Sequence, residues 1–132
     1  MLFVDIPTND TWTRDYGPLT VTESDGSVKT LDFCFNGWGL KFASCLDNLV
    51  TSRLVERKLI TADNINFRDF VLEGGGIESD GGGTLLTTSH CQLSPNRNAT
   101  LSREQIEHEL KNRLGASRVL WVNHGYLAGD DT

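Results

Sequence analysis

The sequence is short of several features that mark particular classes of protein. No apolar run approaches the roughly 20 residues that cross a bilayer, and residues 1–6 are too short and too acidic for a secretory signal. A net charge of −6 leaves no basic excess for binding nucleic acid. Three cysteines, an odd number, argue against a disulfide framework and favour a reducing compartment. We therefore expect a cytoplasmic protein without a nucleic-acid or membrane partner.

The residues that are present predict an α/β unit that occurs twice. Asp25-Gly26 and Asp80-Gly81 each lie between two short strand-like runs and predict hairpins. The first unit is predicted to contain strands at 19–23 and 28–35, a helix at 44–59 and a strand at 66–72. The second is predicted to contain strands at 76–79 and 84–88, a helix at 103–114 and a strand at 118–122. This order divides the chain into approximate units at 1–72 and 73–132, which we expect to bury faces against one another.

The helix at 103–114 carries the strongest local signals. Ser102 and Gln105 form a capping box that fixes its start. Gly115 supplies a C-terminal stop, because glycine adopts the left-handed conformation without steric cost. The predicted buried stripe consists of Ile106, Leu110 and Leu114. These signals predict both ends of the helix and its buried face.

The cysteines are weak candidates for a nucleophile. His90 and Cys91 are adjacent, but neighbouring residues of a strand point to opposite faces, so we favour a packing role for Cys91 over thiolate chemistry. Cys34 within a strand and Cys45 near a helix start are interpreted as packing residues too. No catalytic residue is therefore assigned from the cysteines.

The three tryptophans fall into two groups. Trp121 lies within an apolar strand and is expected in the core. Trp12 and Trp38 lie in polar, glycine-containing loops, where a large flat ring can form a ligand wall or a lid. For these two residues the ligand-wall and core interpretations stay equally open.

Acidic residues recur at equivalent places in the repeat. Asp15 precedes the first strand of the first unit, and Glu73 lies 58 residues later, before the first strand of the second unit. A further step of 58 reaches Asp131. Carboxylates that converge on one axis would suit a planar cation such as a guanidinium, which they can bind in bidentate fashion. The alternative is coincidence, because solvated acids are common in loops.

Ordered sequence blocks cover nearly the whole chain and resemble one family. Its members are the agmatine deiminases and the related bacterial peptidylarginine deiminases. The blocks are NDTWTRDYGP at residues 9–18, NGWGLKF at 36–42, LEGGG at 72–76, GTLLTT at 83–88, NRN at 96–98 and GDDT at 129–132. Each block is weak evidence alone, but their order makes the combined resemblance specific.

The resemblance implies a fold and a chemistry. The fold is the pentein α/β propeller of five ββαβ units, of which this chain would hold about two. The chemistry is hydrolysis of a guanidinium to a ureido group and ammonia, as in conversion of agmatine to N-carbamoylputrescine for putrescine synthesis. A cysteine attacks the guanidinium carbon, a histidine moves protons, and carboxylates hold the cationic substrate, without a metal or cofactor.

The resemblance also assigns site residues. By motif position Asp15 is the guanidinium-binding aspartate and Trp12 the aromatic wall of the substrate site. Glu73 is the acid of the Glu-Gly-Gly block, expected to bind or orient the substrate or the catalytic histidine. Asp131 belongs to the Asp-Asp-Thr block and is expected to bind substrate. For Asp15 the competing interpretation is an ion pair with Arg14 or a turn-capping role.

The chain departs from the family pattern at its catalytic residues. The family's histidine lies in a Gly-His-x-Asp motif beyond the Asp-Asp-Thr block, and its cysteine lies in a late glycine-rich segment. Neither is in this sequence, so we expect an internal part of the enzyme that is inactive by itself. A peptidylarginine or free-arginine substrate stays open, as does a non-catalytic cation-binding or interaction remnant. We also expect self-association, or association with a fragment that carries the missing units.

Overall fold

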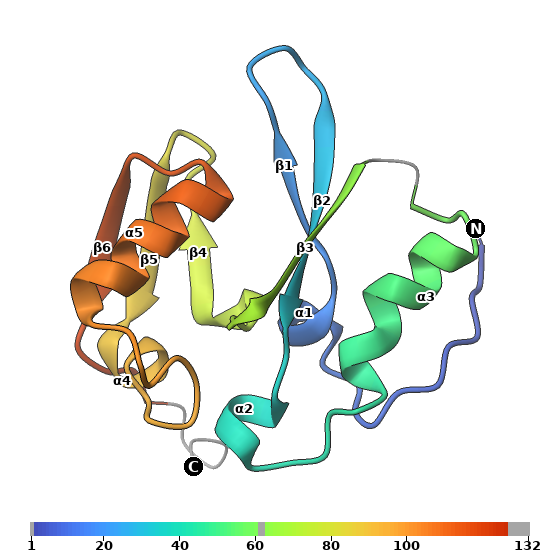
Figure 1. The fold of residues 1–132 in the computed structure, drawn as a ribbon, viewed down its shortest axis with the longest axis horizontal. Coiled ribbons are helices and arrows are strands. Elements are labelled where there is room, and N and C mark those ends of the chain that lie inside the picture. The colour runs from blue at the N-terminus through green and yellow to red at the C-terminus, as the bar shows by residue number, and fades with distance from the viewer. Residues whose placement is uncertain (1, 61–62, 127–132) are drawn as a thin grey trace. The chain divides into compact units, whose positions relative to one another are not determined.

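The computed structural model describes residues 2–60 and 63–126, and it divides the chain between Gly75 and Gly76 into two units (Figure 1). Each unit contains a three-stranded sheet with the order β1-β2-β3 or β4-β5-β6. In both sheets the first two strands are antiparallel and the third pairs in parallel with the second. A parallel pair needs a crossover connection, and helical segments supply it in each unit.

The first sheet consists of β1 (Leu19–Thr22), β2 (Val28–Cys34) and β3 (Asp63–Val71). The crossover from β2 to β3 contains the short turn α2 (Gly37–Leu40), the 3-10 turn η1 (Asp47–Leu49) and α3 (Val50–Glu56). Strand β2 is central and largely buried, because β1 and β3 flank it. The parallel register shifts between Phe33 and Cys34, the point where β2 ends.

The one-turn helix α1 (Thr13–Tyr16) lies before β1. Its Tyr16 ring packs with Phe35 and Val50 in a buried cluster. The chain before α1 is tied to α3, because Arg53 donates to the carbonyl of Pro7 at 2.8 Å and Arg57 donates to that of Asp5 at 2.7 Å. These contacts fix the start of the described chain along one helix of its own unit.

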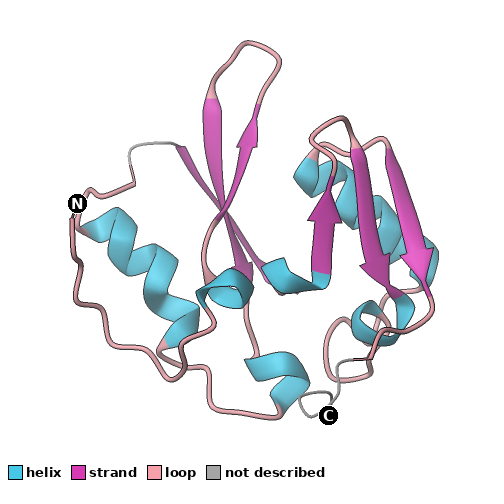
Figure 2. Cartoon of the chain, turned by 180° about the vertical axis from the view of Figure 1, so that it is seen from behind, coloured by secondary structure: helices cyan, strands magenta, loops and turns pink. Residues whose placement is uncertain are grey.

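The second sheet consists of β4 (Ile77–Ser79), β5 (Thr84–Thr88) and β6 (Arg118–Val122), which lie side by side in Figure 2. The 3-10 turn η2 (Gly74–Gly76) precedes β4. The crossover from β5 to β6 contains α4 (Ser89–Gln92) and α5 (Arg103–Leu114). Buried side chains of α5 and of the sheet form the core of this unit; they are Ile77, Leu85, Ile106, Leu110 and Val119.

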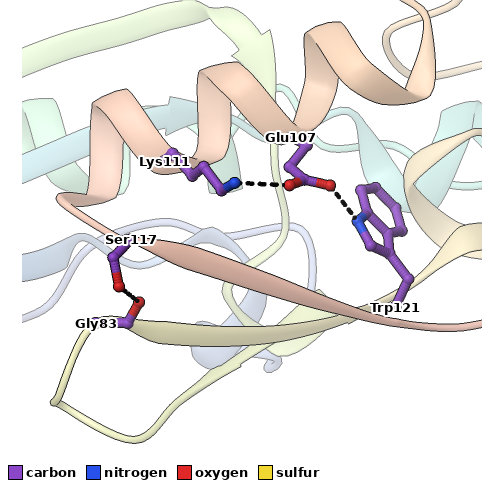
Figure 3. A network of polar contacts seen from close by, with 5 residues as sticks. All are labelled: Gly83, Glu107, Lys111, Ser117 and Trp121. Atoms are coloured by element: carbon purple, nitrogen blue, oxygen red, sulfur yellow. Dashed lines mark hydrogen bonds and ion pairs between the residues drawn. The ribbon is translucent and has the colours of Figure 1, made fainter.

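Helix α5 has the predicted ends and the predicted buried face, except that Leu114 is half-buried. The capping box forms, and Gly115 has a left-handed φ of 68°. Figure 3 shows how α5 contacts β6: the indole of Trp121 donates to Glu107 at 3.0 Å, and Glu107 also pairs with Lys111 on its own helix at 2.7 Å. In the loop before β6, the hydroxyl of Ser117 donates to the carbonyl of Gly83 at 3.1 Å.

Several sequence predictions are wrong in detail. His90 and Cys91 lie in the helical turn α4 rather than in a strand, because the Thr88 side chain accepts from the Cys91 amide at 3.3 Å and caps a new turn. Cys45 is exposed rather than packed, because it precedes η1 in an irregular segment. Trp121 is only partly buried, since its indole reaches toward Glu107.

The predicted helix at 44–59 is shorter than expected. It starts with η1 at Asp47, and α3 ends at Glu56. Among the described residues, no helix combines the length and the apolar character that crossing a bilayer demands.

Candidate functional site

Asp15 lies in α1 and is half-buried. The turn is closed by the Gly17 amide, which donates to the carbonyl of Thr13 at 2.8 Å. Next to Asp15, the Tyr16 hydroxyl donates to the carbonyl of Asp10 at 2.8 Å, and only 5% of Tyr16 is exposed. Burial raises the pKa of Tyr16, and the nearby Asp47 carboxylate adds to this effect. The Tyr16 anchor thus holds the backbone that carries Asp15.

The two carboxylate oxygens of Asp15 bind two different donors. The indole Nε1 of Trp38 donates to Oδ2 at 3.1 Å, and the backbone amide of Gly75 donates to Oδ1 at 3.1 Å. The donors come from α2 and η2, so three segments that are distant in the sequence meet at one carboxylate. A carboxylate oxygen has two lone pairs, so each oxygen retains capacity for a further donor. A guanidinium could supply two such donors in parallel.

The Glu-Gly-Gly block packs directly against the Arg14-Asp15 peptide. A Cβ atom at Gly75 would collide with Oδ1 of Asp15, and one at Gly74 would collide with the backbone oxygen of Arg14. Glycine is therefore required at both positions for the two motif blocks to meet. This contact explains why the sequence places small residues directly after Glu73.

The turn α2 has an unusual backbone. Gly37, Trp38, Gly39 and Leu40 have φ angles of 69°, 56°, 78° and 67°, all in the left-handed region. For L-residues other than glycine this region costs roughly 1–2 kcal/mol per residue. The side chain of Asn36 accepts from the Gly39 amide at 3.0 Å and offsets part of that cost.

Aromatic contacts hold the indole of Trp38 in place. Its ring lies edge-to-face with Phe35 at a centroid distance of 5.0 Å and with Phe42 at 5.8 Å. Trp38 also packs against the buried cluster that contains Tyr16. The sequence left core and ligand-wall roles open for Trp38; the structure packs its ring on the core and directs its N–H to Asp15.

Trp12 lies directly before α1, and 55% of it is exposed. It lies three positions before Asp15, whose backbone amide donates to the carbonyl of Trp12 at 3.0 Å. An exposed aromatic ring can cover the face of a planar cation. The role of Trp12 as an aromatic wall stays a prediction.

Glu73 follows β3 and is buried, with 2% exposed. The amide of the preceding Leu72 donates to the carbonyl of Cys34 at 3.1 Å, which places this segment beside the end of β2.

Burial raises the pKa of the Cys34 thiol, and the negative charges of Asp32 and Glu73 act in the same direction. A neutral thiol is a poor nucleophile, which is consistent with the packing role predicted for Cys34. Asp131 lies outside the described residues.

Sequence reasoning missed Asp47, which supports the segment leading to the site. Asp47 is fully buried, and its Oδ1 accepts from the backbone amides of Asn9 at 2.6 Å and Asp10 at 3.2 Å. In return, the Asn9 side chain accepts from the Leu46 amide at 2.7 Å. No sequence signal indicated this role, because an acid at a predicted helix start is more often exposed and the backbone partners of Asp47 are distant in the sequence.

Comparison with known proteins identifies the family. The sequence model of the family described as Porphyromonas-type peptidyl-arginine deiminase matches residues 1–132. The chain belongs to this family. The agmatine deiminase of Stutzerimonas stutzeri is 40% identical over 132 residues, which cover 98% of this chain and 36% of that protein.

Solved structures agree with this family membership. A cysteine-to-serine variant of the C. jejuni agmatine deiminase with substrate bound matches with a TM-score of 0.88 and 44% identity, over 98% of this chain and 38% of that chain. The agmatine deiminase of Enterococcus faecalis matches with a TM-score of 0.82 and 41% identity, over 91% and 34%. The expected pentein-type α/β fold is thus confirmed. This deiminase-family chain spans about 36% of the length of the curated relatives it matches.

Proposed function

We propose that the chain is part of an agmatine deiminase-like hydrolase and contributes the carboxylate that binds the substrate's guanidinium. The reaction would convert agmatine and water to N-carbamoylputrescine and ammonia, a step toward putrescine. The observation that carries the proposal is the carboxylate of Asp15, held by one donor on each oxygen, in a chain of the deiminase family.

Asp15 would act by charge and by geometry. A guanidinium is planar and carries five N–H donors, so a fixed carboxylate can bind two of them side by side. This orients the guanidinium carbon for attack and saves the entropy of arranging it during the reaction. Trp12 would cover the face of the cation, while Glu73 and Asp131 would bind the substrate or orient the catalytic histidine.

The covalent step would use a cysteine and a histidine outside these 132 residues. The thiolate attacks the guanidinium carbon, ammonia leaves with a proton from the histidine, and a thiouronium-type intermediate forms. Water then attacks that carbon, and the carbon–sulfur bond breaks to give the ureido product and the free thiolate. None of the roles of Asp15, Trp12, Glu73 or Asp131 requires a metal or a cofactor.

The test is an assay of the full-length protein with agmatine, with detection of the ureido product. Asp15→Asn is expected to lower kcat/KM by about 100-fold or more, because it removes a charge that pairs with the cation. Asp25→Asn, which changes an exposed acid in the β1–β2 turn, is the matched control and is expected to stay within about twofold. Equal activity of the Asp15 variant and native protein would contradict the proposal.

Cys91→Ala in the same protein tests whether the nucleophile is Cys91 or a cysteine outside these 132 residues. We expect undiminished turnover, because the proposed nucleophile lies outside this chain. Loss of turnover with retained agmatine binding would instead make Cys91 the nucleophile.

A peptidylarginine substrate is the second candidate, because the matching family model is described as a peptidyl-arginine deiminase. The two substrates share the guanidinium and differ at its far end. A direct comparison of kcat/KM for agmatine and for a short arginine peptide decides between them, and faster turnover of the peptide would overturn agmatine. If neither substrate turns over, calorimetry with agmatine tests the non-catalytic cation-binding alternative, which Asp15→Asn should abolish.

A further inference from the structure

We propose that Trp38 is a positioning residue that acts through Asp15, and that the left-handed turn α2 serves to present its indole N–H. The inference rests on the proposed function, since positioning matters when Asp15 holds a guanidinium. It assigns a role to a strained segment whose left-handed backbone its own bulky residues, Trp38 and Leu40, do not favour.

The first step concerns rotation of the Asp15 carboxylate. A carboxylate held through one oxygen can turn about its terminal bond, whose torsional preference is broad. Asp15 is held through both oxygens, by Trp38 on Oδ2 and by Gly75 on Oδ1. Two donors on different oxygens fix the plane of the carboxylate. A planar guanidinium binds in bidentate fashion only in that plane, so loss of either donor weakens its orientation.

The second step concerns strain. Trp38 and Leu40 are bulky residues with φ angles of 56° and 67°, a conformation that persists only where the surrounding structure imposes it. Leu40 is 71% exposed, so its own side chain gains little from packing in this conformation. The contacts that hold the turn involve its neighbours: the Asn36 side chain accepts from the Gly39 amide, and the Leu40 amide donates to the Asn36 carbonyl at 2.9 Å.

The third step concerns the ring. The apolar body of Trp38 packs edge-to-face with Phe35 and Phe42, and its polar edge meets Asp15. An indole is suited to this arrangement, because it combines a large apolar surface with a single donor. Phenylalanine would keep most of the packing and lose the donor. The ring contacts and the hydrogen bond can therefore be separated by one substitution.

Activity provides the first test, in the full-length protein with agmatine. Trp38→Phe is expected to lower kcat/KM by about 10-fold or more, with a smaller effect on the melting temperature. Trp121→Phe is the matched control, because it removes an indole hydrogen bond to Glu107 in the second unit. We expect its kcat/KM to stay within about twofold of the native value. An equal effect of the two substitutions on kcat/KM would overturn the positioning role.

Nuclear magnetic resonance provides a test that needs no turnover. In the same protein labelled with ¹⁵N, Asp15→Asn is expected to shift the indole N–H signal of Trp38 and to speed its exchange with solvent, while the signal of Trp121 stays in place. An unmoved Trp38 signal would overturn the inference even in an active enzyme. If the native protein turns over no agmatine, the proposed function fails. The positioning role is then decided by calorimetry, where Trp38→Phe should weaken agmatine binding by about 10-fold.

The turn itself is tested by a matched pair at Leu40. Leu40→Gly should raise the melting temperature or leave it unchanged, because glycine adopts positive φ freely. Leu40→Val should lower it by several degrees, because a β-branched residue is strongly disfavoured there. If the valine variant melts at the same temperature as the glycine variant or at a higher one, the left-handed conformation of Leu40 is contradicted.

Discussion

Gly75 is the residue at which the two motif blocks meet, and its missing side chain can be tested directly. In the full-length protein, Gly75→Ala would place a Cβ atom against Oδ1 of Asp15 and displace the carboxylate. We expect kcat/KM for agmatine to fall by about 100-fold, since a displacement near 1 Å at the reacting groups has effects of that size.

Gly82→Ala is the matched control for this substitution. Gly82 lies in the β4–β5 turn, where a Cβ would make only ordinary contact at 3.5 Å with Asp80. We expect activity within about twofold of the native value. Similar losses in the two alanine variants would show that Gly75 has no special relation to Asp15.

Asp32 gives a prediction for pH. Burial raises its pKa above the ordinary 3.8, while Arg68 and the hydroxyls of Thr51 and Ser52 act in the opposite direction. The folded state therefore binds this proton more tightly than the unfolded state does. The contribution of Asp32 to stability must then fall as the pH rises from 3.8 through the raised pKa.

Asp32→Asn removes this dependence. The unfolding free energy of the variant minus that of the native protein should increase as the pH rises from 3.8 to the raised pKa of Asp32, and it should level off at higher pH. Denaturant unfolding at a series of pH values from about 2.5 to about 7.5 measures the difference. Asp80→Asn should behave oppositely, with its change below pH 3.8, because backbone amides of Thr84 and Gly82 lower the pKa of Asp80. A difference for Asp32→Asn that decreases with pH would contradict the assignment.

At the level of elements, Asp47 joins η1 to the segment that leads into α1. Its Oδ1 accepts from two backbone amides, and its side chain is fully buried. Asp47→Ala leaves both amides without this acceptor, so the free energy of unfolding should fall by about 2–3 kcal/mol. Asp47→Asn keeps an acceptor oxygen and should cost less. Denaturant unfolding measures both variants, and a loss below about 0.5 kcal/mol for alanine would show that the amides find other partners.

The elements differ in how far local sequence determined them. Helix α5 was predicted to the residue, because Ser102, Gln105 and Gly115 set its ends through contacts within a few positions. The turn α2 was not predicted, because the bulky residues Trp38 and Leu40 disfavour its left-handed backbone and because Asp15, the partner of the Trp38 indole, lies 23 positions away. At α4 the error came from the Thr88 cap, which ends a strand and starts a helical turn.

In the candidate site, too, the residues could be predicted from sequence motifs, whereas their tertiary contacts could not. Motif position predicted Asp15, Trp12, Glu73 and Asp131, and these roles stay predictions. The hydrogen bonds of Asp15 to Trp38 and Gly75 span 23 and 60 residues, so no local pattern could indicate them. The role of Asp47 was not predicted for the same reason, since its backbone partners lie 37 and 38 residues away.

For the whole molecule, the exposed apolar side chains predict self-association of the 132-residue chain. Among residues 2–60 and 63–126, the large hydrophobic residues with more than half of their surface exposed are Leu2, Phe3, Trp12, Leu40, Phe42 and Tyr126. Exposed apolar surface favours association with other chains where such side chains form a contiguous patch. In sedimentation velocity we expect oligomers of the isolated chain, or a stable complex when the remaining part of the protein is co-expressed. A monomer with a cooperative melting transition would contradict this expectation.

The contact between Cys45 and Asn9 allows movement within the first unit to be followed by fluorescence. Cys45 is exposed, whereas Cys34 and Cys91 are partly buried, so a maleimide dye should label it first. Its sulfur lies 3.8 Å from the Asn9 side chain, at the attachment of the segment that leads to Trp12 and Asp15. A dye there would change its surroundings when that segment detaches, and its fluorescence would turn a structural contact into a kinetic signal.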